Sequence, residues 1–546
     1  MRKLYLTIVA LGCCLAQSGG KILYNGIVIP AEWPPKNLVI SAEPLPTPPY
    51  LIKGPAVIPI DVGRQLFVDH FLIDETDLRR TFHDAEYYPL NPVLQADQPH
   101  EFVEGVGKAM PFSDGIFYDP ADQLFKAWYY SANSTNYATS PDGVKWTKPN
   151  LDVRPGTNVV IPGARDSSSI WLDLDERDAA KRYKALISRG HMKPMEVFYS
   201  RDGIHWGAPV GKSIPWSDRT TFFRNPFLSK WIMSLRDHDW VPRQVPDMPD
   251  HIGRMRKYLE ADDLVEGLQH WKESITWVGA DRLDGRRIDL NSRPQLYQLD
   301  GFPYESMMIG LFAIWRGQPT DRDKPNNISL GYSRDGFHWD RPQRRPFLAN
   351  SGQVGDWNAM NVQPAGGGCL VVGDRLYFYV SGRAGHPKIR TSGETTMGLA
   401  TLRRDGFASM DAMGRSGTLT TKPVQFSGSR LFVNVDSLAG DLRVEVLDQQ
   451  GRPLPGYGKA DSLPIRVDNT LQMVTWKSHA DLTGSAGKPI RFRFHLREGS
   501  LYSFWVSADE SGASNGYVAA GGPGIPGNRD TAGSKAYATC CRAPIW

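Results

Sequence analysis

From residue 61 onward, the chain alternates between short apolar runs and polar segments rich in Gly, Asp, Asn and Pro. The apolar runs are too short for typical helices and contain many aromatic and β-branched residues. Examples are Phe125-Lys-Ala-Trp-Tyr-Tyr, Trp231-Ile-Met-Ser-Leu and Leu376-Tyr-Phe-Tyr-Val. Runs of this length and composition predict β-strands. A weak helical pattern at 254–268 lies within a repeat that favours strands there too.

A seven-residue motif recurs along this strand pattern. The full copies are Ser140-Pro-Asp-Gly-Val-Lys-Trp146, Ser200-Arg-Asp-Gly-Ile-His-Trp206 and Ser333-Arg-Asp-Gly-Phe-His-Trp339, and degenerate copies occupy 260–271 and 404–407. Five similar units, each with room for four strands, predict a five-bladed β-propeller. The Asp-Gly pair suits a tight turn, and the Trp is expected to pack between neighbouring sheets. We therefore interpret the motif as structural.

The predicted fold class is all-β, with a five-bladed β-propeller followed by a C-terminal β-sandwich. Alternating strands after residue 416 are typical of an antiparallel sandwich. The predicted segments are a signal peptide at 1–20, an extended Pro-rich lead-in at 21–60, the propeller at 61–415, the sandwich at 416–512 and a Gly-rich tail at 513–546. The composition of the tail predicts loose order.

The N-terminus is typical of an export signal. Arg2 and Lys3 precede a short apolar run, and small residues follow it. We expect a periplasmic or extracellular protein. The segment Ala10-Leu-Gly-Cys13 resembles a bacterial lipobox, so a lipid anchor at Cys13 remains an alternative to a fully soluble product.

Charge and cysteine content exclude several classes of function. The chain has 63 basic and 59 acidic residues, and no basic stripe is present, so nucleic acid is not an expected partner. No segment after the N-terminus is apolar enough to span a membrane. The five Cys residues form neither a disulfide framework nor a metal-ligand pattern. We predict a monomer without a cofactor or catalytic metal, although oxygen-rich sites could bind a structural calcium ion.

Polar residues that open the innermost strand of each blade are the candidates for chemistry, because these strands border the propeller axis. They are Asp114, Asp166, Asp218, Glu305 and Asn361. Crowded carboxylates repel one another, so at least one should have a raised pKa. Glycosidic cleavage needs such an acid and a second carboxylate as base or nucleophile. Glu305 has the most apolar neighbours and is the predicted acid, and Asp114 is the predicted base or nucleophile.

The remaining candidates are expected to bind the sugar or adjust a pKa. Asp218 and Asp166 compete for the role of a middle catalytic Asp. The predicted substrate-binding residues are Asp166, Arg219, Trp357, Asn361, Gln363 and His386. A single Asp at the start of a strand often serves only the turn, and a lone Trp or His often only packs. The prediction therefore depends on the whole set converging.

Two of these segments resemble motifs of the five-bladed propeller glycoside hydrolases of families 32 and 43. Phe112-Ser-Asp114-Gly is similar to the first-blade acid motif, and Tyr304-Glu305-Ser is similar to the Glu motif. The run 399–407, followed by a sandwich, resembles bacterial exported proteins near family 32. The resemblance implies catalysis by Asp114, a middle Asp and Glu305. The Asn-Asp-Pro-Asn-Gly and Arg-Asp-Pro signatures of family 32 are absent, so fructan is not indicated as the substrate.

The sequence thus predicts an exported glycoside hydrolase that acts on a plant or algal poly- or oligosaccharide. Three alternatives remain open. A non-catalytic carbohydrate-binding propeller would hold its acids apart or in salt bridges. A surface adhesion protein would use the sandwich as its working module. A phosphorolytic enzyme would need clustered cations beside the acid, and Arg219 is the only evident candidate in the sequence.

Overall fold

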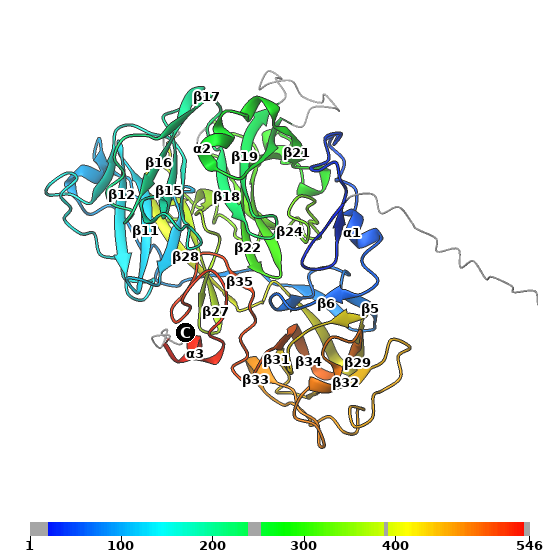
Figure 1. The fold of residues 1–546 in the computed structure, drawn as a ribbon. Coiled ribbons are helices and arrows are strands. Elements are labelled where there is room, and N and C mark those ends of the chain that lie inside the picture. The colour runs from blue at the N-terminus through cyan, green and yellow to red at the C-terminus, as the bar shows by residue number, and fades with distance from the viewer. Residues whose placement is uncertain (1–19, 239–252, 321, 387–390, 540–546) are drawn as a thin grey trace, which may run out of the picture.

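The computed structural model describes residues 20–238, 253–320, 322–386 and 391–539. Five antiparallel sheets form a five-bladed propeller, and a further sheet packs below it (Figure 1). The predicted propeller is therefore confirmed. The predicted signal peptide, with Cys13, lies outside the described residues apart from its last residue. Among the residues described, no helix combines the length and apolar character needed to cross a membrane.

The first three blades follow one another along the chain, each with four strands in sequence order. The strands of the first blade are β10 (Ile116–Asp119), β11 (Leu124–Ser131), β12 (Ser134–Ser140) and β13 (Val159–Pro162). Those of the second are β14 (Ser168–Leu172), β15 (Tyr183–Ser188), β16 (Lys193–Ser200) and β17 (Gly211–Trp216). Those of the third are β18 (Thr221–Asn225), β19 (Lys230–His238), β20 (Arg254–Ala261) and β21 (Ile275–Gly279). The weak helical pattern thus forms β20, with only the short α2 (Leu264–Leu268) after it.

The last two blades recruit strands from distant parts of the chain. The fourth contains β22 (Gln295–Glu305), β23 (Met307–Trp315), β24 (Asn327–Ser333) and the C-terminal β35 (Tyr517–Val518), which pairs with β22. The fifth contains β25 (Met360–Pro364), β26 (Leu370–Val372), β27 (Arg375–Arg383), β28 (Thr395–Arg403) and the N-terminal β7 (Glu86–Tyr87). Because β7 precedes the first blade in sequence and pairs with β28, it closes the ring.

The repeated motif joins neighbouring blades, as predicted. In the first copy, Ser140 Oγ accepts a hydrogen bond from the Gly143 amide at 2.8 Å, and Gly143 has φ 76°. The carbonyl of Gly143 accepts from Tyr379 Oη of the fifth blade at 2.6 Å. In the second copy, the carbonyl of Gly203 accepts from Trp128 Nε1 of the first blade at 2.7 Å. Each turn therefore supplies a fixed acceptor to the blade beside it.

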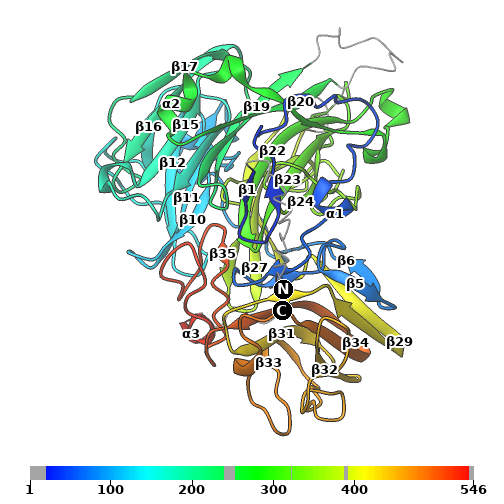
Figure 2. The ribbon, with the colours of Figure 1, turned by 45° about the vertical axis from the view of Figure 1, so that its right-hand side comes forward.

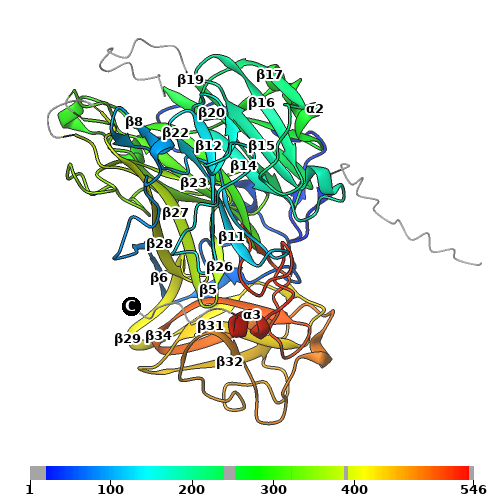
Figure 3. The same ribbon diagram turned by 90° about the vertical axis from the view of Figure 1, so that its left-hand side faces the viewer.

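The C-terminal domain is one eight-stranded sheet folded around its own apolar core (Figure 3). Its strands are β4 (Gln65–Leu66), β5 (Ile73–Thr76), β6 (Arg79–Phe82), β29 (Ala408–Thr421), β31 (Arg430–Asp436), β32 (Asp441–Leu447), β33 (Asp468–Met473) and β34 (Arg491–Ser507). The start of β34 pairs with β32 and its end with β31, so this one strand links layers that a sandwich would keep separate. Residues 65–82, assigned to the propeller from sequence, belong to this sheet.

Both terminal segments pack against the rest of the fold. The lead-in contains β1 (Lys21–Ile22), β2 (Val28–Ile29), α1 (Pro49–Ile52) and β3 (Ile58–Pro59), which pairs in parallel with β30 (Val424–Gln425). The Gly-rich tail carries β35 and α3 (Ser534–Thr539) and lies between the propeller and the C-terminal sheet (Figure 2). In the described part of the tail, 513–539, the backbone is folded and not loosely ordered as expected. Its backbone folds back on itself through Asn515 N to Asp530 O and Val518 N to Asn528 O.

The remaining elements are short. A two-stranded ribbon consists of β8 (Phe102–Val103) and β9 (Val106–Gly107). Single turns of 3-10 helix occupy Pro99–Glu101, Ala179–Lys181, Trp271–Glu273, Arg282–Asp284, Ile288–Leu290 and Thr483–Ser485.

Candidate active site at the propeller mouth

Polar side chains from all five blades meet at the end of the propeller where the innermost strands begin, which we call the mouth. Three contacts between blades define it. Ser113 Oγ donates to Asp300 Oδ2 at 3.3 Å, the Arg219 amide donates to Ser167 Oγ at 2.9 Å, and Gln363 Nε2 donates to Gln298 Oε1 at 2.8 Å. The structure therefore brings together Asp114, Asp166, Asp218, Arg219, Asn361 and Gln363, all named from the sequence.

The backbone is strained where three of these strands begin. Phe112, Arg219 and Asn361 have φ values of 43°, 62° and 50°, a region that non-glycine residues rarely adopt. Such strain is costly and is typically found at functional sites, where the surrounding structure holds it in place. At the mouth it turns each chain sharply just before it enters the inner strand.

Asp114 is fully buried and bound by Arg165. Arg165 Nη1 donates to Asp114 Oδ1 at 2.9 Å, Arg165 Nη2 donates to Asp114 Oδ2, and neither side chain is exposed. Burial raises the pKa of the Asp114 carboxyl to about 7, although Arg165 opposes the rise. Because both oxygens are occupied, Asp114 suits the positioning of Arg165 better than the predicted attack on a sugar.

Asp300 is a carboxyl that the sequence reasoning missed. It lies on β22, is 5% exposed, and accepts hydrogen bonds only from neutral donors, Gln298 Nε2 at 2.5 Å and Ser113 Oγ at 3.3 Å, within the described contacts. Burial raises its pKa to about 7, with Gln298 and the more distant Arg256 opposing. Asp300 therefore has the features of a general acid that stays protonated near neutrality.

Two other acidic side chains of the mouth, Asp166 and Asp218, lie beside cations. Burial opposes ionisation of Asp166, but Arg219, at 3.3 Å, and the Ser167 amide hold its pKa below the usual value. Asp166 is one-third exposed and is the most accessible carboxylate among the mouth acids. Asp218 pairs with Arg236 and lies 3.8 Å from His191 Nδ1.

A fifth acidic residue of the mouth, Asp323, was not predicted. Burial opposes its ionisation, but Arg383 and Lys324 hold its pKa well below the usual range. Asn361 donates to it at 3.3 Å, which gives this predicted binding residue a fixed orientation. Gln363 Oε1 accepts from Arg383 at 3.1 Å and is similarly fixed.

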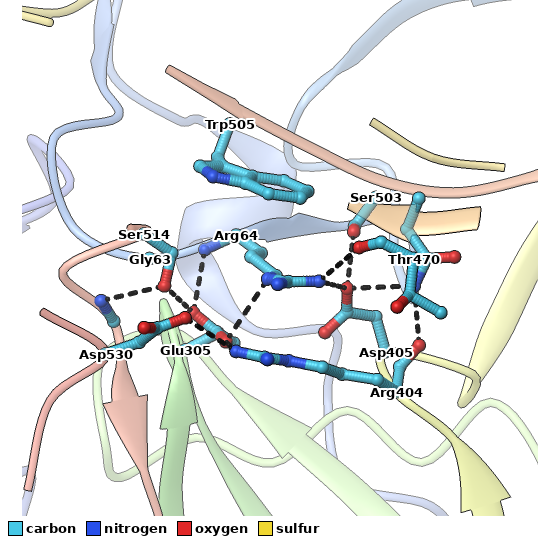
Figure 4. Close-up of polar contacts among 12 residues, drawn as sticks. Gly63, Arg64, Glu305, Arg404, Asp405, Thr470, Ser503, Trp505, Ser514 and Asp530 are labelled. Carbon is cyan, nitrogen blue, oxygen red and sulfur yellow. Dashed lines mark hydrogen bonds and ion pairs between the residues drawn. The ribbon is translucent and has the colours of Figure 1, made fainter. Parts of the chain in front are cut away.

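Glu305 does not belong to the mouth. It ends β22, five residues beyond Asp300, which corresponds to about 17 Å of extended strand. Its Oε1 lies 3.5 Å from Arg64 Nε and 3.4 Å from Arg404 Nη2, and its Oε2 accepts from the Arg64 amide and Ser514 Oγ (Figure 4). Its side chain is not exposed. This placement is incompatible with the predicted acid role, because no sugar can reach a carboxyl enclosed on every side.

The sequence placed Glu305 at a strand start because it assigned the wrong segment to the inner strand of the fourth blade. That strand is β22, and its first residues, which include Tyr297 and Gln298, lie at the mouth. The segment that Glu305 was expected to open, 304–310, contains the end of β22 and the start of the neighbouring β23. The polar pattern Gln295-Leu-Tyr-Gln-Leu-Asp300 was the available signal for the residues that do reach the mouth.

Trp357 and His386 are not part of the described contacts of the mouth. The Trp357 ring packs on the fifth blade, since a Cβ at Gly382 or Gly398 would collide with it, and it meets Tyr87 edge-on at 5.2 Å. Its predicted role in sugar stacking is therefore replaced by packing. His386 is exposed beside a segment that the structure does not describe.

Among the described residues, no group of three or more His, Cys, Asp or Glu side chains has an arrangement that could hold a metal ion.

No family model matches the sequence, and no curated protein is similar to it. Several solved structures align with the chain at low similarity. An N-acetylgalactosamine deacetylase from F. plautii is 15% identical, covers 62% of this chain and 96% of its own, and gives a TM-score of 0.39. A fructofuranosidase from Schwanniomyces occidentalis is 11% identical, covers 78% and 98%, and gives 0.35. A thermostable family-43 glycoside hydrolase is 11% identical, covers 56% and 95%, and gives 0.39. The functional argument therefore depends on the geometry of the mouth.

Proposed function

We propose that the protein is a glycoside hydrolase whose active site is the propeller mouth. The observation that carries the proposal is the separation of carboxyl pKa values at one site. Asp300 has a pKa raised to about 7, whereas Asp166 is held ionised. Two carboxyls with pKa values pushed apart are what acid- and base-assisted glycosidic cleavage requires.

In this mechanism Asp300 donates its proton to the leaving glycosidic oxygen as the bond to the anomeric carbon breaks. Asp166 either removes a proton from an attacking water or attacks the anomeric carbon itself. Water then supplies the hydroxyl of the released sugar. The separation of the two carboxyls when substrate is bound decides between these routes, about 5–5.5 Å for retention and 6.5–9.5 Å for inversion. Asp114 fixes Arg165, and Arg219 keeps Asp166 ionised.

Export and action on a plant or algal poly- or oligosaccharide complete the proposal. The N-terminal signal pattern supports export, and the many hydrogen-bonding groups of the mouth suit a polyhydroxylated ligand. A screen of released sugars against plant and marine glycans tests it, with Asp300→Asn as the inactive variant. Arg224→Met is a matched control, because Arg224 lies on β18 beyond the mouth and stacks on Trp231. Sugar release that persists in Asp300→Asn would contradict the assignment.

A second candidate function is non-catalytic carbohydrate binding. The observation that favours it is that Asp114, Asp166, Asp218 and Asp323 all lie in ion pairs, as a purely binding site would hold them. Isothermal titration beside the activity screen separates the two functions. A glycan that binds without turnover in both the wild type and Asp300→Asn would support the binding function.

A further inference from the structure

Basic side chains lie among the carboxyls of the mouth. In the part of the chain that the structure describes, ion pairs join Asp114, Asp166, Asp218 and Asp323 to Arg165, Arg219, Arg236, Lys324 and Arg383. Burying a cation without compensating charge is costly, so a buried guanidinium whose donors lack a partner indicates a negative ligand.

Arg219 lies among these charged groups and has two donors without a partner among the described residues. Its side chain is 7% exposed, and its Nη2 lies 3.3 Å from Asp166 Oδ1. Its Nε and Nη1 are buried and have no hydrogen-bond partner in the described structure. The guanidinium lies over the Phe112 ring at 4.3 Å and near the Tyr297 ring at 5.4 Å. Guanidinium N–H groups without a partner are charge-assisted donors of the kind that bind oxyanions.

The protein holds Arg219 in place by a second buried cation. Arg256 is unexposed, and its guanidinium donates to the carbonyls of Arg219, at 2.6 Å, and Tyr297. Burial and the neighbouring Arg236 lower the pKa of Arg256 to about 9. No carboxylate within the described residues accepts a hydrogen bond from Arg256. Arg256 therefore fixes the backbone of Arg219, which indicates that the position of Arg219 at the mouth is not accidental.

Tyr297 responds to the same positive field. Burial would raise the pKa of its phenol, but Arg219, Lys324, Arg383 and Arg236 lower it to about 7. The cations that lower the pKa of Tyr297, Arg219 first among them, would also stabilise a bound anion.

We propose that the mouth binds an oxyanion through Arg219, either a sulfate ester or carboxylate carried by the sugar or free inorganic phosphate. The sugar-borne case rests on the proposed function, and it assigns the substrate to the anionic glycans. The phosphate case would replace water by phosphate, whose oxygen would form the new bond to the anomeric carbon as Asp300 protonates the leaving oxygen.

The test measures binding by isothermal titration, with turnover assayed separately. The probes are inorganic sulfate, inorganic phosphate, sulfated galactan oligosaccharides with their desulfated forms, and oligogalacturonates with their methyl esters. The proteins are the wild type, Arg219→Met, Arg219→Lys and the control Arg224→Met. We expect Arg219→Met to weaken oxyanion binding by about tenfold to hundredfold, since charge-assisted hydrogen bonds are lost. Arg219→Lys should recover part of the loss, and Arg224→Met should match the wild type.

Preference for a charged glycan over its neutral counterpart, dependent on Arg219, supports a sugar-borne anion. Phosphate binding dependent on Arg219, with sugar phosphate as product, supports free phosphate as the source. Equal binding of charged and neutral glycans without measurable binding of sulfate or phosphate overturns the inference, as does an equal loss in Arg224→Met. If oxyanion binding depends on Arg219 but no glycan is cleaved under any condition, the proposed hydrolase function is wrong and the oxyanion site is still supported.

Discussion

At the scale of single residues, Asp300 and Glu305 show that burial alone does not identify a catalytic acid. Both lie on β22, both are buried, and burial raises the pKa of both. Glu305 has two arginines, a backbone amide and a serine around it, whereas Asp300 accepts only from Gln298 and Ser113. A carboxyl without a charged donor can keep its proton and give it to a substrate.

We predict that Asp300→Asn lowers kcat by about 10²- to 10⁴-fold, because that is the usual contribution of a general acid. The substitution keeps the shape and the contacts with Gln298 and Ser113, so the thermal midpoint should change by only a few degrees. Steady-state kinetics on a cleaved glycan, with Arg224→Met as control, measures the effect. A loss below tenfold would show that another group supplies the proton.

The same residue sets a pH dependence. Asp300 must be protonated to act, so kcat should fall as pH rises through about 7, the pKa to which burial raises it. Asp166 must be ionised, and its pKa is held below the usual value of about 3.9 for Asp, so the acidic limb should lie below about pH 4. A kcat profile from pH 3 to 9, on the order of half a unit per step, records both limbs. An alkaline limb that survives unchanged in the residual activity of Asp300→Asn would contradict the assignment.

At the scale of elements, the repeated turn is the feature that the sequence predicts best. Its hydrogen bonds are local, because the Ser and Asp side chains of one motif accept from backbone amides of the same motif. The contact that joins blades needs only one carbonyl in a fixed orientation. Local chemistry of this kind is visible in seven residues of sequence.

We predict that Gly203→Ala is more destabilising than Gly207→Ala. Both glycines have positive φ, 79° and 62°, so backbone strain should lower the free energy of unfolding by about 1–2 kcal/mol in each variant. A Cβ at Gly203 would also lie 2.5 Å from Trp128 Cζ2, whereas a Cβ at Gly207 meets nothing within 4 Å. Overpacking should add about 1–3 kcal/mol at Gly203 alone. Denaturant unfolding of the two variants measures the difference, and equal losses would show that the turn does not pack tightly against the neighbouring blade.

The inner strand of the fourth blade shows why the site was only partly predictable. Gly301 and Pro303 interrupt β22, and both are unusual inside a strand. Gly301 lies against the Phe223 ring, where a Cβ would approach to 2.5 Å, and Pro303 lies on the inner edge of the blade, where a missing amide is tolerated. These reasons depend on tertiary packing, so the apolar run 309–315 appeared to be the better inner strand. Asp114, Asp166, Asp218 and Arg219 were predicted because each closely precedes a short run that forms the first strand of its blade, β10, β14 or β18.

At the scale of the whole molecule, a buried ion network joins five segments of the chain (Figure 4). Arg64 of the N-terminal segment and Arg404 of the fifth blade contact Glu305, Asp405 and Asp530, which come from the fourth blade, the fifth blade and the tail. Asn434 and Ser503 of the C-terminal sheet donate to Asp405 at 3.1 and 2.7 Å. Three carboxyls thus share two guanidiniums, which explains how burial can raise the pKa of Glu305 despite the arginines.

We predict that Glu305→Gln changes neither kcat nor the fold and costs about 1 kcal/mol or less near neutral pH, because the network holds one carboxyl more than its arginines can pair. The sign of the pH effect follows from the raised pKa. The folded wild type binds a proton that the unfolded chain releases above about pH 4.3, so its free energy of unfolding should fall as pH rises from there, and the variant should lack this decline. Denaturant unfolding from pH 5 to 8, on the order of one unit per step, measures it. A steep loss of turnover in a stably folded variant would restore Glu305 as a catalytic residue.

Asp530→Asn should behave in the opposite way, because Arg404 depends on it. Asp530 Oδ2 accepts from Arg404 Nη2 at 2.7 Å, and neither side chain is exposed. Removing the negative partner of a buried arginine costs about 3–5 kcal/mol. The loss of stability should affect the whole molecule, because Asp530 links the tail to the fifth blade and Ser514 links it to the fourth. Asp509→Asn is the matched control, because Asp509 is exposed and only accepts from the Ser511 amide at 2.9 Å, so it should cost less than about 1 kcal/mol. Two separate unfolding transitions in Asp530→Asn, with a single transition in the control, would show that the network couples the propeller to the C-terminal sheet. Equal stability of the two variants would show that this contact of the tail does not stabilise the fold.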